Sequence, residues 1–211
     1  MSPVQHFASE AVRGTLGRGT DVDACVELVG RIDRLLDEAA THLQGAGARL
    51  ACRAGCNFCC HLRVNVLPHE AIALFRYLQS RMPPAVAQQV RSTLRRNVQT
   101  PPGPPRACAF LVQGECAAYE VRPSACAAYH STSRERCEES FRDPAVASGT
   151  VALQGLQAVA LALEAGVNEA LQGEGLSNVA LELHTAVAAL LADPALIARW
   201  RSGRPLIKEH R

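Results

Sequence analysis

Eight of the nine cysteines fall into two close groups, and no other feature constrains the chain as much. The first group contains Cys52, Cys56, Cys59 and Cys60, and the second contains Cys108, Cys116, Cys126 and Cys137. Thiolates crowded this closely repel one another, so they stay together only in disulfides or around a soft cation such as zinc or iron. The cellular compartment decides between these two possibilities.

The N-terminal sequence has no basic segment that leads into an apolar run, and no apolar stretch of about 18 residues follows. We therefore expect a cytoplasmic protein that does not enter a membrane. Disulfides are scarce in a reducing compartment, 211 residues is long for a disulfide framework, and nine cysteines is an odd number. These observations favour metal ligation over disulfides, and export from the cell would reverse that preference.

Composition limits the possible partners. With 211 residues and 48% hydrophobic content, the chain can bury a core without metal, as one domain or one domain with a helical extension. The 22 basic residues nearly balance the 20 acidic ones, and the arginines are scattered along the sequence rather than striped along one face. We expect metal ions as partners and neither nucleic acid nor a membrane, and the composition leaves a protein partner open.

Apolar spacing predicts helices before and between the cysteine groups. The first runs from Thr20 to about Leu43, with Cys25 in its apolar stripe as a buried hydrophobe and not a ligand. Residues 62–67 permit a short extended piece. Further helices are expected over 68–81, beginning at a proline, and over 85–98, followed by a stiff connector at 100–105.

The part that follows Cys137 is rich in Ala and Leu, has no cysteine and reads as helical scaffold. Helices are predicted over 152–171, 179–191 and 194–200. Two glycines weaken the case for one unbroken helix over 152–171, and the helix over 179–191 is expected to open near Ser177. The fold class is therefore mainly α, with an irregular cysteine-rich metal-binding region packed on a helical scaffold. We expect a tail (1–19), a cysteine-cluster metal-binding domain (20–140) and a C-terminal helical segment packed on that domain (141–211).

The first cysteine group allows two local structures. If residues 52–60 were helical, all four thiols would lie on one face. Gly55 makes a loop equally possible, in which backbone amides donate to the sulfurs. The side chains of Cys59 and Cys60 diverge, so the two rarely bind one tetrahedral ion together. We infer more than one metal ion, or a cluster with bridging positions.

The second group has wider spacings, which fit ligands on loops and helix starts rather than a zinc-ribbon knuckle. Arginines near the thiols would offset the negative charge of a four-thiolate site, although a solvated surface position explains each one alone better. They are Arg53, Arg63, Arg106, Arg122, Arg134 and Arg136. His61 and His130 lie beside cysteines, and imidazole is a good zinc or iron ligand. Because eight thiols already suffice, a supporting or surface role is favoured for each histidine over ligation.

No catalytic or nucleotide-binding motif accompanies the cysteines. A nucleophile elbow, a P-loop, a dinucleotide fingerprint and paired catalytic carboxylates are all missing from the sequence. The sequence thus predicts a metal site without a reaction, and leaves open whether the protein is an enzyme.

Two segments resemble a known family. They are Cys52–Cys60 (CRAGCNFCC) and Cys108–Tyr129 (CAFLVQGECAAYEVRPSACAAY). They are similar to the YkgJ-type cysteine-cluster family, described as zinc- or iron-chelating CxxCxxCC proteins, over residues 50–140 or so. The most specific part is the pattern CxFL…GxCxxYxxRPxxC, which the second segment matches.

Two departures limit what the resemblance implies. The spacing from Cys52 to Cys56 is one residue longer than in the family pattern, which a loop tolerates, and Ala127 stands where the family commonly has Arg. Relatives such as flagellin lysine N-methylases carry the motif in an enzyme with an implied iron-sulfur centre. That activity does not transfer, because no methyl-donor site is visible here.

Three functions compete. The first is a metalloprotein whose zinc, iron or iron-sulfur cluster acts in redox chemistry, in metal handling or beside a protein-modifying enzyme. The second is a zinc-braced interaction module or accessory subunit. The third, a thiol-disulfide redox protein, is disfavoured because no CxxC pair follows a strand in a βαβ context.

We expect the eight grouped cysteines to converge on one metal-binding locus, with Cys25 outside it. Arg122 and Pro123 are expected to position the backbone that presents Cys126, with Arg122 facing the thiolates or a nearby carbonyl. Loss of metal is expected to disorder residues 50–66 and 106–140 while the terminal helices persist.

Overall fold

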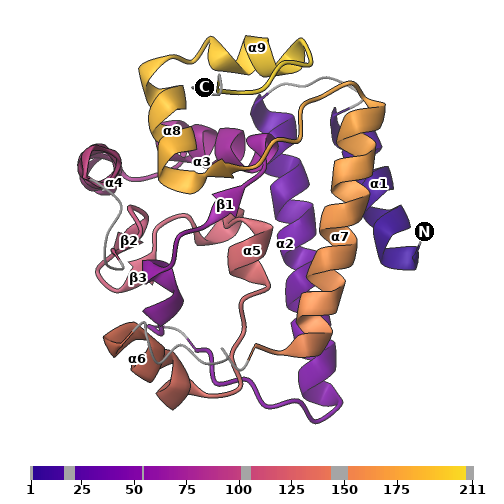
Figure 1. The fold of residues 1–211 in the computed structure, drawn as a ribbon, viewed down its shortest axis with the longest axis vertical. Coiled ribbons are helices and arrows are strands. Elements are labelled where there is room, and N and C mark those ends of the chain that lie inside the picture. Colours follow the sequence, from indigo (N-terminus) through magenta and orange to yellow (C-terminus); the bar gives the residue numbers. More distant parts are fainter. Residues whose placement is uncertain (1, 17–21, 54, 101–105, 144–151, 208–211) are drawn as a thin grey trace.

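The computed structural model describes residues 2–16, 22–53, 55–100, 106–143 and 152–207, and it is mainly α, as predicted (Figure 1). Two short antiparallel strand pairs, β1–β4 and β2–β3, complete the described part. The helices are α1 (Pro3–Leu16), α2 (Val22–Gly45), η1 (Phe58–His61), α3 (Pro68–Ser80), α4 (Pro84–Gln99), η2 (Tyr119–Val121), α5 (Ser124–Ala127), α6 (Arg134–Arg142), α7 (Gln154–Gly173), α8 (Leu183–Ala192) and α9 (Leu196–Arg201), and the strands are β1 (Asn65–Val66), β2 (Leu111–Val112), β3 (Glu115–Cys116) and β4 (Leu181–Glu182).

Three long helices, α1, α2 and α7, pack side by side along one edge of the molecule (Figure 1). Residues 1–19 were expected to be a tail, but residues 3–16 form α1, which lies along α7. Ala8, Val12 and Leu16 recur every four residues and are buried against the neighbouring helices. The backbones approach closely at Gly166 of α7, where an added Cβ atom would lie 2.3 Å from the carbonyl oxygen of Gln5.

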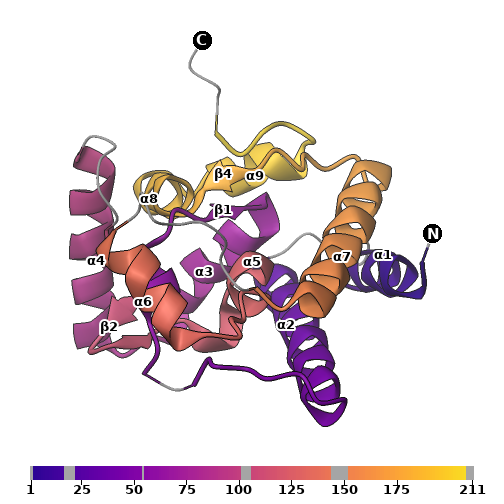
Figure 2. The ribbon, with the colours of Figure 1, turned by 60° about the horizontal axis from the view of Figure 1, so that its bottom comes forward.

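Helix α3 lies at the centre, between α2 on one side and α8 on the other. Nearly every residue of its first two turns is buried, and Pro68 begins the helix as expected. Helix α4 packs against α8 at the far side of the molecule (Figure 2). The predicted helices over 20–43, 68–81 and 85–98 are thus confirmed as α2, α3 and α4. The predicted connector at 100–105 lies mostly outside the described residues.

The C-terminal third differs from the prediction at one boundary. The helix expected over 179–191 begins only at Leu183, because Leu181 and Glu182 form β4 and pair with Val66 and Asn65. The Glu182 carboxylate then caps α8 by accepting hydrogen bonds from the amides of His184 and Thr185. Helix α7, in contrast, is unbroken despite its two internal glycines.

The cysteine-rich segments lie at one end of this scaffold. From the lower end of α2 the chain runs along the bottom of the molecule in Figure 1 to η1, and α6 lies beside η1. Within the described ranges, none of the helices has the length and apolar character needed to cross a membrane.

Candidate metal centre

The first cysteine segment is a loop followed by a short 3-10 helix, and not an α-helix. The amide of Cys56 donates to the Arg53 carbonyl at 2.9 Å, and the amide of Cys60 donates to the Asn57 carbonyl at 3.0 Å. Gly55 has a φ of 76°, which L side chains rarely adopt and which ends any helical path here. Of the two structures that the sequence allowed, the loop is the one formed, and it accommodates the extra residue between Cys52 and Cys56.

Backbone hydrogen bonds join this loop to the second cysteine segment. The Cys60 carbonyl accepts from the Cys108 amide at 2.7 Å, and the Asn57 side chain donates to the Gly114 carbonyl at 3.2 Å. Further along, the Cys52 sulfur accepts a hydrogen bond from the Ser131 amide at 3.2 Å. Backbone donation to a thiol is therefore present, as the loop interpretation predicted.

The four cysteines of the second group lie on different local elements. Cys108 precedes β2, Cys116 ends β3, Cys126 lies in α5 and Cys137 lies in α6. None of the nine cysteines forms a disulfide. Cys25 is fully buried on α2, which confirms it as a core residue.

Neighbouring thiols raise the pKa of Cys52 and the pKa of Cys126, and the two sets of neighbours share one member. Burial raises the pKa of Cys52, and the charges of Cys56, Cys59 and Cys137 raise it further. Burial likewise raises the pKa of Cys126, with added effects from Cys108, Cys116 and Cys59. Cys59 therefore belongs to both sets.

The pKa of Cys59 is itself raised, first by a hydrogen bond with Cys60 and then by burial. Burial also raises the pKa of Cys108 to about 11, although the backbone amide of Phe110 opposes this shift. Without metal these thiols are protonated at neutral pH. A soft cation would replace the protons and relieve the repulsion between thiolates, so the donor set fits zinc or iron.

The described residues do not form a finished coordination sphere. Among them, no three His, Cys, Asp or Glu side chains stand in position to hold one metal ion. The convergence of eight thiols on a single locus therefore stays a prediction.

Arg122 is nearly buried and pairs with two carboxylates of α2. Its Nε donates to Asp33 at 2.7 Å and its Nη2 donates to Asp37 at 2.5 Å, while the guanidinium lies 4.2 Å from the centre of the Tyr119 ring. Arg122 was expected from the sequence to face the thiolates or a nearby backbone carbonyl, and it binds these two carboxylates instead. Arg122 still acts on the thiols, because its charge lowers the pKa of Cys116 against the larger effect of burial.

Pro123 has the expected backbone role. Its φ is −56°, and its carbonyl accepts hydrogen bonds from the amides of Cys126 and Ala127 at 2.8 and 2.9 Å. The short helix α5 thus begins at this proline and carries Cys126.

Sequence reasoning missed Glu70, a buried carboxylate in the first turn of α3. Its Oε1 accepts from the Ser124 amide at 2.8 Å and from the Ser124 hydroxyl at 2.7 Å, while its Oε2 accepts from the Leu67 amide at 2.8 Å. Glu70 therefore connects α3 to the turn that carries Cys126. Its place three residues after the helix N-cap was the available signal.

The other candidates near the cysteines have varied surroundings. Arg106 donates to backbone carbonyls at the end of α4, and Arg134 lies over the Phe58 ring at 5.2 Å. The His61 ring packs against Phe141 at 4.6 Å. Burial lowers the pKa of His130, and its Nδ1 has no hydrogen-bond partner among the described residues. The remaining arginines, which are exposed, are Arg53, Arg63 and Arg136.

Fold and site together define a mainly α protein with a thiol-rich candidate metal centre. Residues 51–145 match the CxxCxxCC family, whose description reads "Putative zinc- or iron-chelating domain". This agrees with the resemblance found in the two cysteine segments. Neither a curated protein nor a solved structure matches the chain.

Proposed function

We propose that this protein binds zinc or iron through its eight grouped cysteines and that the metal centre is its functional element. The observation that carries the proposal is that hydrogen bonds join two segments that carry eight free cysteines, through the Cys108 amide to the Cys60 carbonyl and the Asn57 side chain to the Gly114 carbonyl. The family description of residues 51–145 supports the same chemistry. Bound there, the metal would supply electron transfer if it is an iron-sulfur cluster, or a structural or transferable ion if it is zinc.

Two neighbouring ions, or one cluster with a bridging thiolate, fit this arrangement better than one ion. The first set is Cys52, Cys56, Cys59 and Cys137, and the second is Cys59, Cys108, Cys116 and Cys126. Four thiolates satisfy one tetrahedral ion. Cys59 is therefore the candidate bridging ligand, and its hydrogen-bonded neighbour Cys60 supplies the remaining donor.

Metal analysis of protein purified without oxygen, combined with an acid-labile sulfide assay, tests the proposal. We expect about two zinc or iron ions per chain. Iron with sulfide gives visible absorption, whereas zinc leaves the protein colourless. Cys59→Ser should remove more metal than Cys137→Ser, and Cys25→Ser should leave the metal content unchanged. Protein that carries no metal under these conditions would refute the proposal.

A second function, a zinc-braced interaction module, is favoured by apolar side chains exposed beside η1. Leu62 is 48% exposed and Phe141 is 39% exposed. In this function zinc only holds the loops, and a protein partner or a protein-modifying enzyme covers these side chains. A colourless protein that loses a partner on Leu62→Glu while keeping its zinc would support this function over the first.

A further inference from the structure

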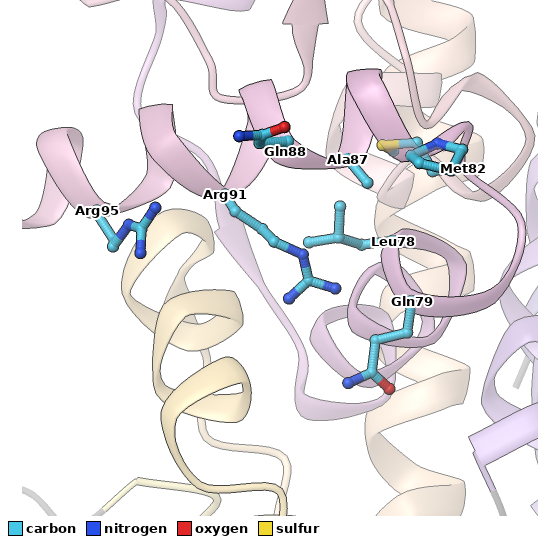
Figure 3. A pocket seen from close by; sticks show the side chains of 8 residues that line it. Leu78, Gln79, Met82, Ala87, Gln88, Arg91 and Arg95 are labelled. Carbon is cyan, nitrogen blue, oxygen red and sulfur yellow. The ribbon is translucent and has the colours of Figure 1, made fainter.

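A groove between α3 and α4 lies outside the cysteine segments. Its volume is about 340 Å³, and its floor consists of the buried side chains of Leu78, Met82 and Ala87. Two arginines of α4, Arg91 and Arg95, line it in addition. Figure 3 shows Arg91 extending from α4 across the groove past Leu78.

The two arginines have no carboxylate to neutralise them within the groove. They are separated by four residues, so they lie on one face of α4. No lining residue is acidic, and no salt bridge involves either arginine among the described residues. An anion beside Leu78 would meet the guanidinium group of Arg91, whereas Arg95 lies one helical turn further along α4.

The sequence around the groove contains basic residues but no acidic ones. Between Glu70 and Glu115 the chain has no Asp, Glu or Lys but six arginines, which are Arg76, Arg81, Arg91, Arg95, Arg96 and Arg106. The chain has 22 basic residues in all, so 16 remain elsewhere against all 20 acidic ones. Arg76 pairs with Asp23 of α2, so the positive charge at the groove comes from Arg91 and Arg95 of α4.

We propose that the groove binds an amphipathic anion, a small molecule with one carboxylate or phosphate group on a short apolar body. The apolar floor accepts the body, Arg91 binds the head group, and Arg95 adds positive charge at the end of the groove. The volume suits a small ligand. None of the lining residues is aromatic, so the groove lacks the rings on which nucleic-acid bases stack.

Titration of the full, metal-loaded chain with octanoate tests the proposal, with amide NMR shifts as the readout. We expect shifts at the residues that line the groove, and weaker binding of both 1-octanol, which lacks the charge, and acetate, which lacks the apolar body. The double variant Arg91→Gln/Arg95→Gln should weaken octanoate binding about tenfold. Arg96→Gln is the matched control, since Arg96 lies on the same helix but does not line the groove.

The control variant and the metal content distinguish a specific site from general charge or misfolding. Arg96→Gln should bind octanoate as the wild type does, and all variants should keep the wild-type metal content. Equal weakening by Arg96→Gln, or equal binding of octanol and octanoate, would overturn the proposal. Tighter binding of a single-stranded oligonucleotide or of phosphatidylglycerol vesicles, lost in the double variant, would also overturn it and make this region a polyanion surface.

Discussion

At the scale of single residues, buried polar groups attach the cysteine region to the helical scaffold. Arg122 is a clear case, because it belongs to the cysteine-bearing segment while its partners Asp33 and Asp37 belong to α2. Burial is the largest effect on Arg122 and opposes its charge, but Asp33, Asp37 and Tyr119 together outweigh it and raise the pKa of the guanidinium. Asp33 is as buried as Arg122, whereas the side chain of Asp37 is 48% exposed.

Arg122→Ala is expected to lower the free energy of unfolding by about 3–5 kcal/mol, because it leaves the buried Asp33 without a counter-charge. Urea denaturation with the metal content measured in parallel checks this. Asp37→Asn is the control and should have a much smaller effect, since that carboxylate reaches solvent. Full stability and full metal occupancy in Arg122→Ala would mean that the two ion pairs contribute neither to stability nor to metal binding.

His69 is buried on α3, and neither of its ring nitrogens has a hydrogen-bond partner among the described residues. Burial lowers its pKa below the ordinary 6.5. The unfolded chain therefore binds a proton near that pH while the folded chain does not. The free energy of unfolding is therefore not reduced by His69 above about pH 6.5. It falls as the pH drops from there toward the lowered pKa of His69 in the folded chain.

His69→Leu should remove this pH dependence and should not destabilise the protein at pH 7.5, because an unpaired buried polar group costs about 1–3 kcal/mol. Urea denaturation of both proteins at pH 7.5 and 5.5 measures the difference. Effects of acid on the metal are common to the two proteins and cancel in the comparison. An unchanged pH dependence in the variant would show that His69 does not titrate.

At the scale of elements, apolar periodicity predicted the long helices well. Helices α2, α3 and α4 follow stripes such as Leu28, Ile32 and Leu36, which local spacing alone reveals. The predicted start of α8 was wrong because it depends on the pairing of β4 with β1, a strand more than a hundred residues away in the sequence. Helix α1 was not predicted, and its residues were assigned to a tail. The cysteines of the candidate site could be predicted from their spacing in the sequence. The role of Glu70 could not, because it depends on a contact with Ser124, which lies 54 residues away in the sequence.

Gly166→Ala should destabilise the packing of α1 against α7 by about 1–3 kcal/mol. The added methyl group would meet the Gln5 backbone at 2.3 Å, which outweighs the gain in helix propensity. Gly155→Ala in the same helix is the control, because its methyl group meets only the flexible end of Leu43 at 3.2 Å. Thermal unfolding of the two variants checks this, and equal stability would contradict the close approach of α1 and α7.

Glu70→Ala should separate the first turn of α3 from the turn that carries Cys126. Three hydrogen bonds to one buried carboxylate are lost, and we expect about 2–3 kcal/mol of destabilisation with roughly 10–100-fold weaker metal binding. Competition with a chelator of known affinity measures the second effect. Asp23→Asn is the control, since it removes an exposed carboxylate that also contacts α3, through Arg76. Unchanged metal affinity in Glu70→Ala would contradict a positioning role.

At the scale of the whole molecule, the two cysteine segments differ in how many of their side chains are buried, so we expect them to depend on metal to different degrees. No described residue from Thr41 to Asn65 is buried, and none of α6 is buried either. The chain around Cys108 and Cys116 differs, because Phe110 and Val121 belong to the core. From the sequence alone, metal was expected to hold both 50–66 and 106–140 in place. From the burial pattern we now expect a smaller region, which excludes the chain around Phe110 and Val121.

Removal of metal should abolish hydrogen-exchange protection in the loop before η1, in η1 and in α6, while α2, α3 and α7 keep theirs. Residues 106–128 should respond less, since their buried side chains pack without the metal. Mild acid should act like a chelator, because burial raises the pKa of Cys52, Cys108 and Cys126 and protons then compete with the cation for the thiolates. Hydrogen exchange at neutral pH before and after chelation measures the effect. Uniform loss of protection would show that metal holds the entire fold together, and loss confined to 106–128 would show that the buried Phe110 and Val121 do not anchor that segment.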